Sequence, residues 1–533
     1  MNLKKCPIIA HPSTVSAMEH RLGNLSVALS ALRFPFSRRL RAALSIFFLA
    51  AVILAPRLFD LGAFLTADEK RWQANTANFL NALAVGDFDH LLQQPHPGIT
   101  TQWLGAVSVL SESWSARKLP LAAGLSVLLG MIGYVFFRLW GLGPAVLVTL
   151  LLAWNPPLVA HSRVYAMDAL LAEFLVLSLG LLLLWLESRR TRYLIAAGIV
   201  GALAVLSKLP GLLLVPFTGL VLGFHPLVPL RRDSWGPGSW ALRPGGGWKQ
   251  GARALSLWCI AFVVTLAFVL PSVVTNTIPV LQNIAAFFSS GDYRELHQER
   301  SFFYVSTLAV ASTPLQVAAL CAFPVVWWAS RGRRGRVQAA QVATLFLFAL
   351  LFILEMSIGA KKGDRYLLPA LALFDVVVAA LAAWAWTASR ATRFLAAVIV
   401  LCGLAWEGIL LWQLHPYALA YVNPLFRPAA TGKRMGWGEG LDRAAEYLNT
   451  KPNAGTLTVA SFYPNEFAYR FHGRVVPLNQ FTHEDVRYVV LYRAMLERGG
   501  DAWETKILEE FRRQTPEEVV FLNGLPYVWI YAR

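Results

Sequence analysis

Two adjacent carboxylates, Asp68 and Glu69, follow closely after the first long apolar segment of the chain. A carboxylate that stays ionised can accept a proton from a hydroxyl group or orient that group for attack. A structural role is also open, because Thr66 and Glu69 have the spacing of a capping box that begins a helix. The cap explains Glu69 better than Asp68, so we expect Asp68 to be the catalytic acid and Glu69 to lie at the substrate or only to begin the helix.

Basic residues on the same side of the predicted membrane spans form a second group of candidates. Such side chains are costly close to hydrocarbon unless they are paired or solvated, and topology signals do not require them there. They predict an anion site at the outer membrane surface, most simply for a lipid phosphate. Snorkelling interface anchors are the alternative for one or two of them. The candidate substrate-binding residues are Arg71, Arg163, Lys208, Lys361, Lys362, Arg365 and Tyr366.

Two further residues complete the candidate site. Asp168 begins the fourth predicted span, five residues after Arg163, and is expected to be catalytic or to pair with an outer cation. His96 closes the first outer loop; a lone histidine is usually structural, but it can also contact substrate. Glu69 and His96 are available ligands for a divalent metal, although no spacing demands one and no cofactor is predicted with certainty.

The elements that must position these residues are membrane-spanning helices. The 533-residue chain is 56% hydrophobic, which indicates a polytopic membrane protein. A bilayer span needs roughly 20 apolar residues, and about eleven segments qualify by this rule. They are residues 40–59, 119–138, 143–160, 168–187, 192–207, 210–228, 254–273, 304–329, 338–357, 366–388 and 394–413.

The arginine tracts between these segments predict their orientation. By the positive-inside rule the side that carries them is cytoplasmic, so residues 1–39 are a cytoplasmic segment and 40–413 are the membrane domain. Asp68 and the tail from residue 414 then lie outside. The net charge of +17 comes largely from such tracts and does not predict nucleic-acid binding. The tracts are Arg38-Arg39-Arg41, Arg189-Arg190-Arg192, Arg231-Arg232, Arg331-Arg333-Arg334-Arg336 and Arg390-Arg393.

Residues 414–533 have the pattern of a small α/β domain. A helix is expected over 440–449 and strands over 456–462 and 486–492. Asn523-Gly524 between two apolar runs predicts a β-hairpin within 517–531. We therefore expect a mixed sheet in an extracytoplasmic domain, without a catalytic constellation of its own.

Taken in order along the chain, these features resemble the GT-C glycosyltransferases. The resemblance is carried by the acids of the first outer loop, by His96-Pro97, by Asp168, and by Lys362-Gly363-Asp364-Arg365-Tyr366-Leu367-Leu368-Pro369 before a late span. Within that class, the sequence resembles bacterial members related to protein O-mannosyltransferases and to the lipid A aminoarabinose transferase. The tail sequence Gly436-Trp437-Gly438-Glu439-Gly440 is also similar to that of bacterial members.

The resemblance implies a multi-pass protein of the bacterial cytoplasmic membrane that transfers a sugar, with inversion, from a polyprenyl-phosphate donor to a lipid, glycan or protein acceptor. It implies that Asp68 is the catalytic acid of the first loop, that Asp168 matches the acid of the second, and that Lys361, Lys362 and Arg365 hold the lipid phosphate.

The alternative from another class is a transporter or flippase of an anionic lipid. A transporter places its charges near the membrane midplane and often shows internal repeats, whereas these charges collect at the outer face. A third hypothesis is a non-catalytic relative that acts as an assembly factor. The intact Asp68 argues against it.

Overall fold

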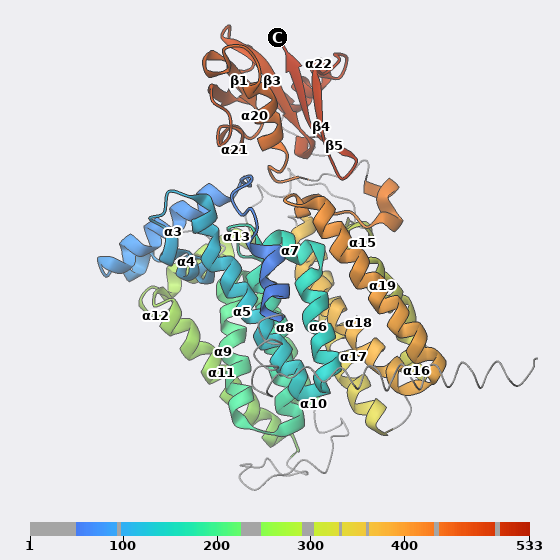
Figure 1. Cartoon of the computed structure of the whole chain (residues 1–533). Coiled ribbons are helices and arrows are strands. Elements are labelled where there is room, and N and C mark those ends of the chain that lie inside the picture. Colours follow the sequence, from blue (N-terminus) through green and yellow to red (C-terminus); the bar gives the residue numbers. More distant parts are fainter. Residues whose placement is uncertain are drawn as a thin grey trace, which may run out of the picture. The chain divides into compact units, whose positions relative to one another are not determined.

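The computed structural model describes residues 49–92, 97–224, 247–289, 303–329, 333–358, 362–430, 436–495 and 502–533 (Figure 1). Val52–Arg533 form one unit, and all the packing discussed below lies within it. Most of the described chain is helical, and one small sheet follows near the C-terminus.

Each of the eleven predicted spans coincides with a helix or a bent pair of helices. Among the described residues, six helices are long and apolar enough to cross a membrane, and two bent pairs raise this number to eight. Three shorter apolar helices, Leu49–Leu58, Thr191–Ser207 and Leu209–Gly223, match the remaining predicted segments. A multi-pass membrane protein is therefore confirmed, while the number of eleven spans stays a prediction. The six long helices are α5 (Trp114–Trp140), α8 (Asp168–Ser188), α11 (Gly247–Val269), α17 (Arg333–Ile358), α18 (Leu368–Ala388) and α19 (Arg390–Leu414).

Both bent pairs break at a proline that begins the second helix. α6 (Leu142–Trp154) turns by 63° into α7 (Pro156–Ser162), and α15 (Phe303–Ala311) turns by 116° into α16 (Pro314–Ala329). Proline is tolerated in the first turn of a helix, where its missing N–H has no partner to lose. At the first break the Asn155 side chain caps α7 by accepting from the Leu158 N–H at 3.1 Å.

Helix α8 is the most deeply buried of the long helices, with 94% of its apolar window inside the structure. It is apolar on all sides, as expected of a helix surrounded by protein. Its neighbours are α5, α9 (Thr191–Ser207) and α18. The first residue of this buried helix is Asp168, so α8 presents a fixed carboxylate at one end of the bundle.

The segment between Leu58 and α5 contains a predicted helix with a buried aromatic face. Helix α3 (Glu69–Ala84) buries Trp72 and Phe79. Half of the predicted capping box forms: the Glu69 carboxylate accepts from the Thr66 N–H at 2.8 Å, whereas the Thr66 hydroxyl has no partner among the described residues. The same segment continues through η1 (Phe88–His90), α4 (Ile99–Gly105) and η2 (Ala106–Ser108).

The remaining helices of the membrane part are short. They are η3 (Leu209–Leu213), α10 (Leu214–Phe224), α12 (Ser272–Thr275), α13 (Thr277–Ser289) and η5 (Asp364–Leu367).

The predicted mixed sheet is confirmed in the C-terminal part. Its strand order is β2-β1-β3-β5-β4, with β1 parallel to β2 and β3, and β5 antiparallel to β3 and β4. The predicted hairpin turn lies at Asn523-Gly524, where both residues have the positive φ angles that such a turn requires. The strands are β1 (Thr458–Ser461), β2 (Arg474–Pro477), β3 (Val486–Tyr492), β4 (Glu518–Leu522) and β5 (Leu525–Ala532).

Short helices complete this domain. The predicted helix over 440–449 is α20 (Leu441–Asn449). The others are η6 (Ala418–Ala420), η7 (Pro424–Ala430), η8 (Ala454–Thr456), α21 (Pro464–Phe467), η9 (Leu478–Gln480), η10 (Arg493–Met495) and α22 (Ala502–Phe511).

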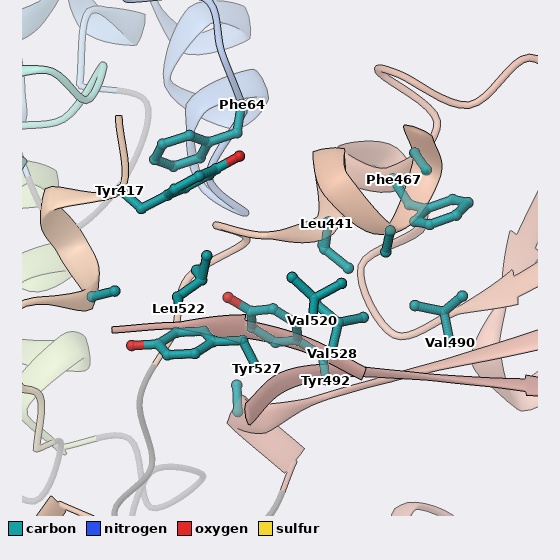
Figure 2. Close-up of a cluster of buried hydrophobic side chains, with 14 of the residues drawn as sticks. Phe64, Tyr417, Leu441, Phe467, Val490, Tyr492, Val520, Leu522, Tyr527 and Val528 are labelled. Carbon is teal, nitrogen blue, oxygen red and sulfur yellow. The ribbon is translucent and has the colours of Figure 1, made fainter. Parts of the chain in front are cut away.

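A hydrophobic cluster joins the first loop to the C-terminal domain. Ala63 and Phe64 belong to the same buried cluster as Leu441, Val520 and residues of β5, several of which are drawn in Figure 2. The Phe64 ring stacks on Tyr417 with 5.5 Å between ring centroids. Close to this cluster, the Arg470 guanidinium of the domain donates to the carbonyl oxygens of Gly62 and Ala63 at 2.9 and 3.1 Å. The segment that precedes Asp68 is therefore held by the C-terminal domain.

Candidate functional site

Four charged side chains predicted from the sequence form one connected cluster. Arg365 Nη1 lies 3.1 Å from Asp68 Oδ2, and Arg365 Nε lies 4.0 Å from Asp168 Oδ2. Lys208 Nζ contacts the other oxygen of Asp168 at 2.6 Å. Residues separated by up to 297 positions thus meet in a chain of alternating acids and cations.

The two acids differ in their access to solvent. The Asp168 side chain is 4% exposed and that of its partner Lys208 is 5% exposed, so this pair is buried. The Asp68 and Arg365 side chains are 19% and 21% exposed. Asp68 is therefore the carboxylate that an incoming hydroxyl group can reach, while the buried Asp168 holds Lys208 and Arg365 in position.

Element ends explain why these residues meet. Asp168 is the first residue of α8, where the helix dipole favours a negative charge, and Lys208 directly follows the last residue of α9. Asp68 directly precedes α3, and Arg365 lies in η5 just before α18. Each functional side chain is thus fixed by the terminus of a helix.

Arg71 and Tyr366 complete the cluster. Arg71 Nη2 binds Asp68 Oδ1 at 2.7 Å from the exposed side of the site. Lys208 Nζ lies 3.9 Å from the centroid of the Tyr366 ring, a cation–π contact. Both oxygens of Asp68 consequently face an arginine.

Glu69 lies apart from the cluster, in a buried structural position. Its carboxylate is fully buried and accepts from the Thr66 and Tyr165 N–H groups at 2.8 and 2.7 Å. Lys118 Nζ completes the set at 3.0 Å. Both oxygens are thereby occupied within the protein, which is the helix-starting role that the capping-box spacing predicts.

Other predicted residues also lie away from the cluster or outside the described residues. Arg163 donates to the Pro56 and Asp60 carbonyl oxygens at 3.1 Å each, and burial lowers its pKa to about 10, so it remains charged at neutral pH. Asp168 therefore pairs with Lys208 and Arg365 rather than with Arg163, its neighbour in sequence.

Lys362 also lies away from the ion pairs of the cluster. Its Nζ donates to the Met356 and Ser357 carbonyl oxygens at the end of α17. The predicted residues His96 and Lys361 lie outside the described residues.

Two aromatic residues at the cluster were missed by sequence reasoning. The Arg365 guanidinium carbon lies 4.1 Å from the ring centroid of Trp437, and the rings of Trp437 and His161 are 6.0 Å apart. The glycines around Trp437 were a usable signal, because alternate glycines suggest a loop of unusual backbone geometry. Nothing in the sequence around His161 distinguishes it from an ordinary buried histidine.

No group of three or more His, Cys, Asp and Glu side chains is arranged to hold a metal within the part of the chain that the structure describes. Of the two metal ligands considered from the sequence, Glu69 has both oxygens occupied. The other, His96, lies outside the described residues. Metal binding stays an untested prediction.

The chain has a polytopic membrane fold of the GT-C type, and the charged cluster lies at its helix ends. The structure is similar to that of ArnT from Cupriavidus metallidurans bound to undecaprenyl phosphate, with a TM-score of 0.51 and 15% identity over 91% of this chain and 97% of ArnT. The fold class predicted from the sequence is thereby confirmed.

Two further comparisons also gave matches. The family model for dolichyl-phosphate-mannose-protein mannosyltransferase matches residues 98–235. The Archaeoglobus fulgidus oligosaccharyltransferase, tethered with an acceptor peptide, aligns with a TM-score of 0.47 and 13% identity over 86% of this chain and 71% of its own. No curated protein sequence matches the chain. The resemblance to GT-C proteins noted from the sequence is confirmed by the family model and the fold.

Proposed function

We propose that the protein is a membrane glycosyltransferase that takes a sugar from a polyprenyl-phosphate donor. The observation that carries this proposal is the chain of ion pairs from Asp68 through Arg365 and Asp168 to Lys208. It combines one accessible carboxylate with cations suited to a phosphate, and both are needed in sugar transfer from a lipid phosphate.

In the proposed reaction, an acceptor hydroxyl or amine attacks the anomeric carbon of the sugar. Asp68 takes the proton from the acceptor as the new glycosidic bond forms. The bond between the anomeric carbon and the phosphate oxygen breaks, and the departing polyprenyl phosphate carries the electron pair. Attack from the side opposite the phosphate gives inversion.

The cations stabilise the charge that develops on the leaving group. Arg365 presents five N–H donors, and its contacts with Asp68 and Asp168 leave donors for phosphate oxygens. Lys208 is held by Asp168 and contributes a second positive charge. Fixed charges of this kind act strongly where water is largely excluded, because no reorganisation is needed during the reaction.

The undecaprenyl phosphate bound in the ArnT structure supports a polyprenyl phosphate as the lipid of the donor. The acceptor peptide of the archaeal protein leaves the acceptor class open, so lipid, glycan and protein acceptors all remain within the proposal. The location that we propose for the protein is a bacterial inner membrane. The arginine tracts support an extracytoplasmic site and C-terminal domain. A lipid transporter is not favoured, because the connected charges lie at helix ends.

The change of Asp68 to Asn tests the proposal. In nanodiscs supplied with a panel of undecaprenyl-phosphate-linked sugars, wild-type protein should release undecaprenyl phosphate, and Asp68→Asn should do so at least about 100-fold more slowly. Binding of undecaprenyl phosphate itself should persist, because a carboxylate that repels the phosphate has been removed.

Asp89→Asn is the matched control, since it makes the same change at an exposed acid of the same loop and should leave release unchanged. Undiminished sugar transfer by Asp68→Asn would overturn the assignment of the base. Failure of the wild-type protein to act on any lipid-linked sugar would argue against the activity itself.

A further inference from the structure

The C-terminal domain inserts one aromatic residue into the charged cluster. Trp437 is half-buried, and one face of its indole covers the Arg365 guanidinium at 4.1 Å. Its carbonyl oxygen accepts from the Ala67 N–H at 2.8 Å, one residue before Asp68. The residue is thus tied both to the cation of the site and to the backbone that carries the base.

The backbone around Trp437 is held in a specific form. Gly436, Gly438 and Gly440 all have positive φ angles, which only glycine adopts without strain. The Gly438 N–H donates to the Tyr492 hydroxyl at 2.9 Å, and Trp437 N–H donates to the Glu439 carboxylate at 2.7 Å. We call residues 436–440 the glycine loop. Its structure presents the indole at one place rather than leaving it free to move.

His161 provides a second, independent observation on the same side of the cluster. The residue is 8% exposed, and its Nδ1 has no hydrogen-bond partner among the described residues. Its ring neighbours Trp437 and lies within electrostatic reach of Asp168, Arg365 and Lys208. A buried polar nitrogen without a partner costs free energy, which a ligand hydroxyl would recover.

The position of these two residues relative to the phosphate cations indicates their ligand. In a lipid-linked donor, the group bonded directly to the phosphate is the sugar. If Arg365 holds the phosphate, a side chain that borders Arg365 outside its ion pairs is placed to contact that sugar. The C–H groups of a sugar ring fit the negative face of an indole, and its hydroxyl groups fit the free imidazole nitrogen.

We propose that Trp437 and His161 bind the sugar of the donor, so that the C-terminal domain supplies part of the sugar-recognition site. This inference rests on the proposed function, because it takes the cations to hold the phosphate of a lipid-linked sugar. It gives the domain a role in choosing the donor.

The test compares two ligands that differ only in the sugar. Binding of undecaprenyl phosphate and of the undecaprenyl-phosphate-linked sugar that wild-type protein uses is measured on purified full-length protein in nanodiscs. Trp437→Ala should weaken the sugar-bearing lipid at least about tenfold and change the bare lipid phosphate less than about twofold. Trp437→Phe, which keeps an aromatic face, should recover part of the loss, and His161→Ala should show the same selectivity for the sugar.

Equal weakening of both lipids by Trp437→Ala would show that the indole only positions Arg365, and it would overturn the inference. Unchanged binding of both lipids would overturn it as well. Trp412→Ala, at a tryptophan of α19 that is 85% exposed, is the matched control and should alter neither affinity.

If wild-type protein binds no lipid-linked sugar, the proposed function itself fails, and this result differs from all of the outcomes above. Thermal unfolding of each variant identifies loss of fold, and His161→Ala decides the question if both changes at Trp437 prevent folding.

Discussion

Asp168 and Lys208 form a buried ion pair, so the charge of each residue depends on that of the other. The two side chains are nearly inaccessible and meet at 2.6 Å, and the second oxygen of Asp168 is turned to Arg365. Removal of one member of a buried pair leaves an uncompensated charge, whereas removal of both can restore stability. Stability and activity should therefore respond differently to changes at this pair.

We expect Lys208→Met to destabilise the protein by about 3–5 kcal/mol, because the Asp168 carboxylate loses its nearest counter-charge. The double variant Asp168→Asn/Lys208→Met should regain most of this stability but should transfer sugar no faster than the single variant. Thermal unfolding in detergent and release of undecaprenyl phosphate are the two measurements. Recovery of transfer by the double variant would show that neither charge serves the reaction.

At the scale of elements, the sequence predicted which residues would lie on one side but not how they would pair. The lengths of the apolar segments and the arginine tracts placed Asp68, Lys208 and Arg365 together at span ends. In the structure Arg365 contacts Asp68 directly and is linked to Lys208 through Asp168. The sequence could not show that Arg163 lies outside this cluster. Its guanidinium donates to the carbonyl oxygens of Pro56 and Asp60, which are distant in sequence, and these contacts depend on the three-dimensional fold. The glycines around Trp437 indicated an unusual loop, but the contact of its indole with Arg365 could not be predicted, because it depends on the docking of the C-terminal domain.

The glycine loop leads to a prediction about a single methyl group. A Cβ atom at Gly438 would lie 2.5 Å from the Leu65 carbonyl oxygen, in a backbone with φ of +125°. Gly438→Ala should therefore displace the loop from the first outer segment, with strain of about 1–3 kcal/mol, and lower sugar transfer at least about tenfold. Gly455→Ala, where a Cβ atom meets nothing within 4 Å, should have no such effect on transfer. Equal activity of the two variants would contradict the docking seen here.

The same loop should make the stability of the C-terminal domain depend on pH. Burial raises the pKa of Glu439 from 4.5 to about 7, and the charge of Asp364 adds to this effect. Because the folded state holds the proton more tightly than the unfolded state, stability is greatest below pH 4.5 and falls as pH rises to about 7. The shift corresponds to about 3 kcal/mol. Glu439→Gln should remove this pH dependence. In thermal unfolding from pH 5 to pH 8, the midpoint of the wild-type protein should fall below that of the variant as the pH rises.

For the whole molecule, the open prediction is the orientation in the membrane. The helices confirm a multi-pass protein, and the basic turn between α8 and α9 contains Arg189 and Arg190. A reporter that is active only outside the cytoplasm should be active after Arg533 and inactive when fused after Arg189. The opposite result at Arg533 would place the charged cluster beside cytosolic substrates and would remove the basis for a lipid-linked donor.

The contact of Phe64 with the core of the C-terminal domain has a consequence for biosynthesis. Phe64 belongs to a cluster that includes residues of β4 and β5, more than 450 positions later in the chain. At roughly 5–20 residues per second, the ribosome needs about half a minute to a minute and a half to make the intervening chain. The segment before Asp68 reaches its final conformation only after the last strand has been made. A nascent chain that lacks β4 and β5 therefore carries Asp68 without this support.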